Sequence, residues 1–191
     1  MRHKFKEFKV KKIVMIVVLA VILATGTAFA DHPSGWGVGV VGQYGIGWGG
    51  GGAGLSLKIP SVPVFWALNV GFTSDWFSAG LTGDYYMIDS PLVSDINLHW
   101  FFGLGGFFDF YNHTVSYLNK EHSYTSFSLG ARVPVGLSWQ PIDLLELFID
   151  AAPSLGVGIR TESKVDDHVL QEGGAGFVWG IPIEIGLRLW F

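Results

Sequence analysis

Apolar residues recur at every second position through long stretches of this chain, and this period constrains the fold most strongly. The last stretch, IPIEIGLRLWF, has an apolar residue at each odd position from Ile181 to Phe191, whereas its even positions include Glu184 and Arg188. Successive side chains of a β-strand point to opposite faces, so this alternation is typical of a strand with one apolar and one polar face. The sequence therefore predicts an all-β chain.

The first thirty residues have a different character. Six basic residues precede an apolar run over residues 13–24, and Ala28, Phe29 and Ala30 fit a cleavage site of the A-x-A type. This order is that of a secretory signal peptide, and the run is shorter than the roughly 20 residues of a membrane-spanning helix. We expect residues 1–30 to be a helical signal peptide cleaved after Ala30, and residues 31–191 to be one domain.

The composition of residues 31–191 narrows the class further. These residues hold six basic and fifteen acidic side chains, a net charge of −9, which disfavours nucleic acid as a partner. The chain has no cysteine, yet it is 49% hydrophobic and 15% aromatic, and no apolar run in this part is long enough for a spanning helix. An exported chain of this kind is predicted to be a membrane β-barrel. The alternative, a soluble β-sandwich, should have polar outward faces.

Alternation and turn residues divide the domain into strands. The predicted strands cover residues 36–48, 53–59, 62–74, 76–88, 96–111, 124–139, 144–160 and 174–191. An even number of antiparallel strands fits an eight-stranded up-and-down transmembrane β-barrel whose termini lie on the same side. Closure would also remove the exposed edges of an open sheet.

The connections between these strands alternate in character. Those after the second, fourth and sixth strands are short or compact and contain proline, whereas residues 112–123 and 161–173 form longer charged stretches. Short turns on one rim and long loops on the other are typical of outer-membrane barrels. We therefore expect the termini on the periplasmic side and the two long loops outside the cell.

Aromatic residues recur at one spacing on the apolar faces. The two members of each pair lie twelve positions apart, which spans roughly 40 Å of strand and, at the usual tilt, about the height of a barrel's apolar band with its aromatic girdles. The predicted membrane-interface aromatics are Trp36 with Trp48, Phe127 with Trp139, and Trp179 with Phe191.

The charged residues within the strands fall on the opposite face. We expect them to form a charge network inside a narrow lumen, because an arginine facing lipid at mid-bilayer would cost roughly 2–4 kcal/mol. The predicted network comprises Lys58, Asp84, Asp109, Arg132, Glu146, Asp150, Glu184 and Arg188. A turn near residues 140–143 predicts that Arg132 lies opposite Asp150 or Ala152.

The final strand also carries an expectation about assembly. Apolar side chains occupy alternate positions up to a terminal aromatic, in the row Ile185, Leu187, Leu189 and Phe191. This row resembles the recognition signal that the barrel assembly machinery reads on outer-membrane proteins.

Several blocks of the sequence resemble a family of small spirochaete outer-membrane barrels. The stretch LGARVPVGLSWQPIDLLELFIDAAPSLGV, residues 129–157, carries the resemblance, and GLSLKIPSVPVFWAL and GDYYMID look like earlier blocks of that family, so the likeness covers most of residues 37–157. The resemblance implies an eight-stranded barrel similar to the OmpA and OmpX membrane domains. It also implies binding of host proteins through surface loops, a role that transfers to no particular residue.

Three motifs could indicate a nucleotide site, a metal site or a catalytic site, but their context does not support these functions. GVGVVG, residues 37–42, matches G-x-G-x-x-G, but no helical period follows it, as a dinucleotide site would require. Asp166, Asp167 and His168 are adjacent in a charged loop, which rarely lets three ligands converge on one metal ion. His99 could serve a lipid-modifying enzyme, but its predicted position faces the lumen. We therefore expect no cofactor, no metal site and no catalytic residue.

Three functions are compatible with this sequence. The first is a structural or surface-interaction role, in which a monomeric barrel with a plugged polar lumen displays extracellular loops. The second is a narrow channel for small or apolar solutes, as in OmpW-like barrels, and the third is a lipid-modifying envelope enzyme. Eight strands leave an interior just filled by side chains, which favours the first. The expected partners are outer-membrane lipid, the assembly machinery and an extracellular protein ligand at the loops.

Overall fold

The structure is a computed structural model that describes residues 33–47, 51–117, 120–161, 163–165, 168–171 and 173–191. The predicted signal peptide and Trp48 lie outside the described residues. Within the described ranges, no helix is both long and apolar enough to cross a membrane.

Within the described residues, the elements are strands apart from one turn of 3₁₀ helix. In chain order they are β1 (Gly37–Gly47), β2 (Gly52–Lys58), β3 (Phe65–Phe72), β4 (Trp76–Val93), η1 (Ser94–Ile96), β5 (Leu98–Tyr117), β6 (Lys120–Arg132), β7 (Val135–Ile142), β8 (Leu145–Ala151), β9 (Ser154–Arg160), β10 (Ser163–Val165), β11 (His168–Gln171) and β12 (Gly174–Trp190). The predicted all-β class is confirmed.

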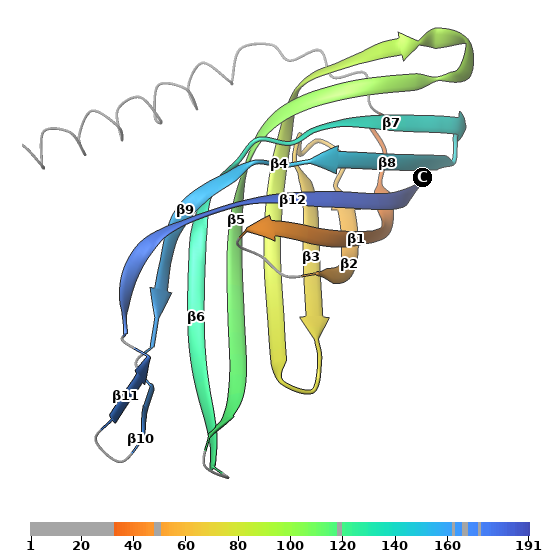
Figure 1. Ribbon diagram of the computed structural model, residues 1–191. Coiled ribbons are helices and arrows are strands. Elements are labelled where there is room, and N and C mark those ends of the chain that lie inside the picture. Colours follow the sequence, from red (N-terminus) through yellow and green to blue (C-terminus); the bar gives the residue numbers. More distant parts are fainter. Residues whose placement is uncertain (1–32, 48–50, 118–119, 162, 166–167, 172) are drawn as a thin grey trace, which may run out of the picture.

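The strands form an antiparallel ring (Figure 1). Ten strands share one sheet, but β6 continues into β7 and β8 continues into β9, so the ten act as eight. Each strand pairs with its neighbours in the chain, and β1 pairs with β12 from Gly37↔Trp190 to Gly47↔Gly180. This pairing of the first and last strands closes the sheet. The small sheet β10–β11 projects from one end.

The two ends of the ring differ. At the terminus end, Trp36 and Phe191 exchange backbone hydrogen bonds of 3.0 and 2.8 Å, and the connections β2–β3, β4–β5 and β7–β8 lie there. The connections β1–β2, β3–β4, β5–β6 and β9–β12 lie at the opposite end, which we call the loop end. Both termini of the ring therefore lie on one side, as the even strand number predicts.

Proline interrupts two strands that the sequence predicts to be continuous. Pro134 separates β6 from β7, and Pro153 separates β8 from β9. Proline has no backbone N–H to give to a ladder, so strands bend or break where it occurs. Nearby amides restore the connection: Val133 N–H donates to the Pro153 carbonyl, and Ala152 N–H donates to that of Pro182. The sheet thus bends at these positions without opening.

Proline has the opposite outcome in β4, where the predicted compact connection after residue 88 is wrong. The strand continues to Val93 and pairs with β5 through Pro91↔His99, with register shifts near Tyr86 and Pro91. Its pairing with β3 ends at Asp84↔Phe65, so β4 has one partner beyond that point. The missing N–H of Pro91 can face the unpaired edge, where proline is tolerated.

The two predicted long loops are also shorter than expected. Residues 112–123 belong mostly to an extended hairpin, because β5 and β6 remain paired up to Tyr117↔Lys120. Residues 161–173 contain the small sheet β10–β11. Antiparallel pairing depends on hydrogen bonds between the two backbones, so two strands can stay paired where their side chains are polar.

The predicted register between the sixth and seventh strands is wrong by two or four residues, depending on which of the two predicted partners of Arg132 is taken. Arg132 lies opposite Ser154, and Asp150 lies opposite Gly136. The turn lies at residues 143–144, nearer to the C-terminus than expected, and a β-bulge between Trp139 and Ile142 shifts the pairing by one further residue. A change in turn position or a β-bulge next to the turn shifts the pairing of every residue farther along the two strands.

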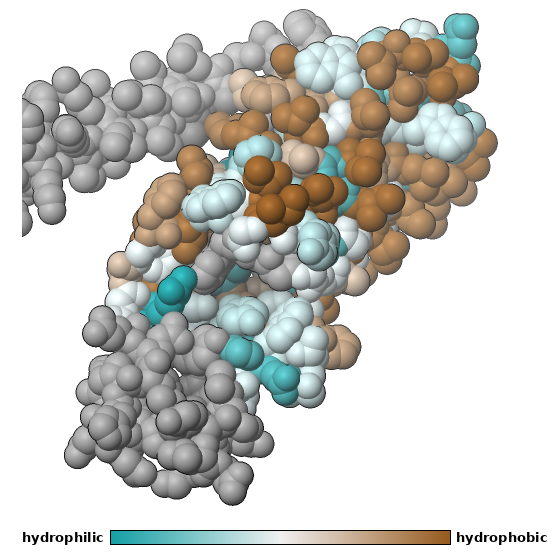
Figure 2. Space-filling view, viewed as in Figure 1, coloured by the Kyte–Doolittle hydropathy of each residue, from teal (hydrophilic) through white to brown (hydrophobic). Residues whose placement is uncertain are grey.

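Burial alternates along the strands with the inside and outside of the ring. In β3 it switches at every residue, so that Ala67 and Asn69 are buried whereas Leu68 and Val70 are exposed. The exposed side of other strands is equally apolar, with Leu55, Leu129, Leu155 and Ile185 among its members. Figure 2 shows hydrophobic residues over much of the surface toward the terminus end and paler residues toward the loop end. The ring is therefore apolar outside and polar inside.

Candidate functional site: the lumen of the ring

Arg132 lies at the centre of a buried charge cluster. Its Nη1 donates to Glu184 Oε1 at 2.9 Å, its Nε lies 3.2 Å from Asp84 Oδ1, and its Nη2 lies 3.9 Å from Asp150 Oδ1. The four residues come from β6, β12, β4 and β8. A guanidinium has five N–H donors in one plane and can therefore serve several carboxylates at once. One arginine in this way connects separate parts of the ring across the lumen.

Two of these carboxylates are direct neighbours. Glu184 and Asp150 are paired across β12 and β8, and both are buried. Like charges directly opposite in a sheet repel each other, so this pair needs a cation close by. Arg132 supplies it from β6, which pairs with β9, the continuation of β8. The predicted contact with Asp150 exists at 3.9 Å, but Glu184 and Asp84 are the nearer partners.

Arg188 occupies a second site toward the terminus end. Its Nη1 donates to Glu146 Oε1 at 3.1 Å, and its Nε donates to Ser56 Oγ at 2.8 Å. The guanidinium lies between two rings, with Cζ 3.9 Å from the centroid of Phe148 and 4.7 Å from that of Phe65. Arginine is suited to stacking on aromatic faces while it forms hydrogen bonds in its own plane.

Four aromatic rings close the lumen at the terminus end. Tyr86 stacks between Phe65 and Phe101 with centroid distances of 4.2 and 4.3 Å, and Trp190 contacts Phe65 edge-on at 6.3 Å. All four are buried, and Trp190 Nε1 donates to Glu146 Oε2 at 2.9 Å. We call Phe65, Tyr86, Phe101 and Trp190 the aromatic layer. The sequence did not predict it, because single aromatics on the polar face carry no periodic signal.

Lys58 and Asp109 do not join either arginine cluster through an ion pair in the described part of the chain. Lys58 donates to the Ile59 carbonyl at 3.1 Å and lies 5.7 Å from the Phe65 ring centroid, at the terminus-end rim. Asp109 lies toward the loop end and accepts a hydrogen bond from Ser128. The eight predicted residues are thus distributed over the two arginine clusters, one rim and one isolated carboxylate.

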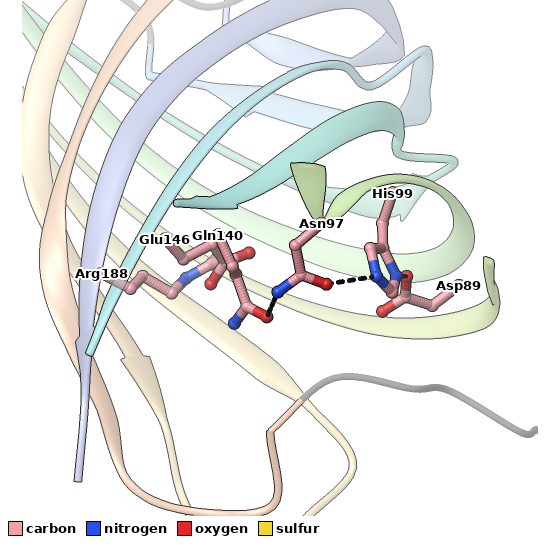
Figure 3. A network of polar contacts seen from close by, with 6 residues as sticks. All are labelled: Asp89, Asn97, His99, Gln140, Glu146 and Arg188. Atoms are coloured by element: carbon pink, nitrogen blue, oxygen red, sulfur yellow. Dashed lines mark hydrogen bonds and ion pairs between the residues drawn. The ribbon is translucent and has the colours of Figure 1, made fainter. Parts of the chain in front are cut away.

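His99 belongs to a separate polar chain near the terminus end (Figure 3). Its Nδ1 lies 3.1 Å from Asp89 Oδ1 and its Nε2 lies 3.2 Å from Asn97 Oδ1. Asn97 Nδ2 donates to Gln140 Oε1 at 3.4 Å. Asn97 has the left-handed conformation, with φ of 55°, which asparagine tolerates better than most residues. The chain fastens the β4–β5 connection to β7, and both ring nitrogens of His99 are occupied.

The lumen widens toward the loop end. A cavity of about 290 Å³ opens there between β1, β2, β3, β4 and β5, with Asp109, Asn69 and Gln43 among its lining residues. A small cavity of about 20 Å³ lies between it and Arg132 and shares Asp109 and Gln43 as lining residues. The lumen is therefore closed at the terminus end, filled by charges at mid-height, and hollow toward the loops.

The discounted metal site cannot be placed, because Asp166 and Asp167 lie outside the described residues. Elsewhere in the described ranges, no three His, Cys, Asp or Glu side chains are grouped closely enough to hold a metal ion. The Gly-rich stretch over residues 37–42 forms part of β1 and opens no helix.

The predicted interface aromatics that the structure describes all lie on the outside. Trp36, Trp139 and Phe191 are exposed near the terminus end, and Phe127 and Trp179 are exposed near the loop end. The predicted assembly row, Ile185, Leu187, Leu189 and Phe191, also faces outward. These positions fit the roles that the sequence predicts but do not test them.

Comparison with solved structures shows what the fold is similar to. A major outer membrane protein from Thermus thermophilus superposes with a TM-score of 0.52 at 14% identity, over 84% of this chain and all of that chain. Neisserial surface protein A (NspA) aligns with a TM-score of 0.41 at 15% identity, over 82% of this chain and 96% of that one. No family model matches the sequence, and no curated protein sequence matches it. In fold, the chain resembles small outer-membrane β-barrel proteins, and the spirochaete family remains a prediction.

The lengths of the contacts around Arg132 predict unequal coupling. Arg132→Met should leave three carboxylates without their cation and cost roughly 3–5 kcal/mol of unfolding free energy. A double-mutant cycle with Glu184→Gln should give a coupling of about 1–3 kcal/mol, and the cycle with Asp150→Asn a smaller one. Urea unfolding of the refolded protein measures both. The cycle of Arg132→Met with Glu146→Gln is the control. Glu146 bonds to Arg188, so the effects of these two substitutions on the unfolding free energy should be close to additive. Larger coupling to Glu146 than to Glu184 would contradict this arrangement.

Proposed function

We propose that the protein is a small integral outer-membrane barrel with a closed lumen, whose role is to display its loop-end segments at the cell surface. The observation that carries the proposal is the inversion of the ring: exposed side chains such as Leu55, Leu129 and Ile185 are apolar, whereas Arg132 and Glu146 are buried inside. In water, a ring with this distribution would leave its apolar side chains exposed to solvent. It suits a bilayer, where a closed strand ladder satisfies every backbone group internally.

Three points support the outer membrane as the location. The predicted signal peptide directs export, the exposed aromatics near both ends suit the two membrane interfaces, and the similar fold from Thermus belongs to an outer membrane protein. In this orientation the termini and the short connections face the periplasm. The β5–β6 hairpin and the β10–β11 sheet then project outside the cell and offer backbone and side chains to an extracellular protein.

A channel is the second candidate, and the filling of the lumen argues against it. The aromatic layer and the Arg188–Glu146 pair occupy the terminus end, and the Arg132 cluster occupies the middle. An eight-stranded ring has an interior only wide enough for side chains, so these groups leave no continuous path. The hollow at the loop end is closed below by the Arg132 cluster.

A lipid-modifying enzyme is the third candidate, and the environment of His99 does not favour it. A general base needs a free ring nitrogen beside the proton that it removes. Both nitrogens of His99 instead contact Asp89 and Asn97, in a chain that holds a connection in place. The protein is therefore proposed to act by binding rather than by catalysis, as a monomer.

Surface display predicts a one-sided pattern of accessibility. An epitope tag inserted between Tyr117 and Lys120 should bind antibody on intact cells, because this connection lies at the loop end. A tag inserted between Asp143 and Leu144, at the β7–β8 turn, should bind only after the outer membrane is permeabilised. Flow cytometry measures both. Equal labelling of the two tags on intact cells would contradict the orientation, and recovery of the protein in the soluble fraction would contradict the location.

The closed lumen predicts that the protein does not conduct ions across a bilayer. Planar bilayers that contain the purified protein should show no discrete conductance steps, and flotation of the same protein with liposomes controls for insertion. The double variant Tyr86→Ala, Arg132→Ala removes one side chain from each obstruction and should conduct if it remains folded. Steady ohmic steps from the wild-type protein would favour the channel function instead.

The terminal aromatic should matter for assembly more than for stability. Phe191→Ser should lower the amount of protein in the outer membrane several-fold and leave signal cleavage unchanged. Phe177→Ser is the matched control, because both side chains lie on the outer face of the ring, where Phe177 is 71% exposed and Phe191 is 73% exposed. Membrane fractionation with heat-modifiable gel migration measures the folded amount. Equal levels of the two variants would show that the last residue has no special part in recognition.

A further inference from the structure

Two neighbouring turns at the terminus end carry exposed aliphatic side chains. Ile96 in the β4–β5 connection is 53% exposed, and Ile142 and Leu144 at the β7–β8 turn are 58% and 47% exposed. Pairing of β5 with β7 reaches Leu98↔Trp139, so the two turns lie side by side. We call Ile96, Ile142 and Leu144, together with the exposed Trp139, the turn patch. Apolar residues gathered on a surface mark contact sites for a membrane or another protein.

Backbone groups of these turns are bonded within the protein. Asn97 N–H donates to the Ser94 carbonyl at 3.1 Å, Gln140 N–H donates to the Asn97 carbonyl at 3.1 Å, and the Leu144 carbonyl accepts from Trp190 N–H at 2.9 Å. Backbone enters an apolar environment only where its polar groups find such internal partners. The unpaired edge of β4 lies on the other side of its hairpin, toward β3, and is not part of the patch.

The hydrogen bond of Trp139 shows how far lipid can extend on this side. Its indole Nε1 donates to the Ile96 carbonyl at 2.9 Å, and this bond also ties the two turns together. A tryptophan at a membrane interface usually keeps its N–H among water and headgroups, which places the ring at the boundary. The N–H of Trp139 has its partner inside the protein, so the ring is free to lie deeper and the boundary can lie at the turns.

Two acidic residues set the limit of this surface. Asp95 directly precedes Ile96, and Asp143 lies between Ile142 and Leu144; both carboxylates are exposed. An ionised carboxylate is costly within the hydrocarbon of a bilayer. The apices of the two turns therefore suit the headgroup level, with the aliphatic side chains beside them directed to the acyl chains.

Lipid fits the turn patch better than a protein partner does. The outward side chains of β7 and β8 lead to it without interruption, since Val135, Leu137, Leu147 and Ile149 are all apolar and exposed. In Figure 2 the hydrophobic surface continues to this end of the ring. The patch lies on projecting turns (Figure 1), so a protein would need a matching groove, whereas acyl chains adapt to a convex surface.

The β2–β3 connection at the same end has a different character. Residues 59–64 include Pro60, Pro63 and the exposed Ser61, and Val62, which is 36% exposed, is their one exposed large aliphatic side chain. This connection lacks the apolar surface of the two other turns and provides an internal comparison for them.

We propose that the turn patch enters the periplasmic leaflet of the membrane, where phospholipid acyl chains cover Ile96, Ile142 and Leu144 and headgroups surround Asp95 and Asp143. The inference rests on the proposed membrane location. It adds that the apolar belt of the ring includes the turns on the β5–β8 side and ends before the β2–β3 connection. These two turns then anchor the barrel in one leaflet.

Fluorophores on single cysteines test the proposal, because the chain has no cysteine of its own. Ile96→Cys and Leu144→Cys carry the label in the patch, Ser61→Cys carries it on the β2–β3 connection, and Leu137→Cys carries it on the outer wall of β7. The refolded proteins are reconstituted in phosphatidylcholine liposomes, with quenching by nitroxide on lipid acyl chains or by iodide on both sides of the bilayer. The labels at positions 96 and 144 should resemble the one at 137, with lipid quenching about threefold stronger and iodide quenching about threefold weaker than at 61.

The label on the wall separates failure of this inference from failure of the proposed location. Lipid quenching at 137, with labels at 96 and 144 that behave like the one at 61, would overturn the inference and leave the barrel in the membrane. Equal lipid quenching at all four positions would also overturn it, because the patch would not differ from the β2–β3 connection. Absence of lipid quenching at 137 would contradict the membrane location and the inference together.

A measurement on the wild-type protein covers the case in which a cysteine variant does not fold. In lipid bicelles that contain the nitroxide lipid, the NMR methyl signals of Ile96 and Ile142 should broaden as strongly as those of Ile185, which is 63% exposed on the outer wall. A water-soluble gadolinium chelate should leave all three sharp. Broadening of Ile96 and Ile142 by the chelate, without broadening by the lipid, would refute the proposal.

Discussion

Pairing of β1 with β12 is the interaction on which the rest of this structure depends. Eleven residues of β1, from Gly37 to Gly47, face the last strand and turn an open sheet into a ring. An open sheet of these strands would leave two edges of unpaired backbone groups, which is untenable in a bilayer and prone to aggregation in water. Closure removes both edges, and it also separates an inside from an outside.

The small size of the ring then dictates what its interior must be. Side chains that point inward meet across the lumen, so their charges have to be matched there. Glu184 and Asp150 lie side by side on neighbouring strands, so a long cationic side chain from another strand has to neutralise them. Arg132 has the reach and the number of donors for this task. Replacing a whole cluster of this kind by apolar groups of similar volume can be neutral for stability, whereas removal of one partner leaves an uncompensated buried charge.

Period-two alternation predicted the eight principal strands of the ring and their apolar and polar faces, because a strand alternates strictly. It could not predict register, since that depends on turn geometry: the turn at residues 143–144 and the bulge near Trp139 together place Arg132 opposite Ser154. Proline was a poor guide to where strands begin and end. Pro91 lies within a strand that has one partner, whereas Pro134 and Pro153 interrupt strands without ending them. The aromatic layer was missed because it has no periodic signature, and it becomes visible only when the sheet closes.

The two halves of the lumen show that the hollow at the loop end is not a failure of packing. In the closed half, glycines lie where larger residues would collide: a Cβ at Gly136 would lie 2.6 Å from the Phe101 ring, and one at Gly186 would meet Phe148. In the loop half, a Cβ at Gly174 or Gly176 of β12 would meet nothing within 4 Å, although one at Gly80, which lines the hollow, would lie 2.5 Å from Asp109 Oδ1. Cores exclude voids of this size because their walls lose dispersion contacts. The chain thus fills one half of its lumen tightly and lines the other mostly with small and polar residues.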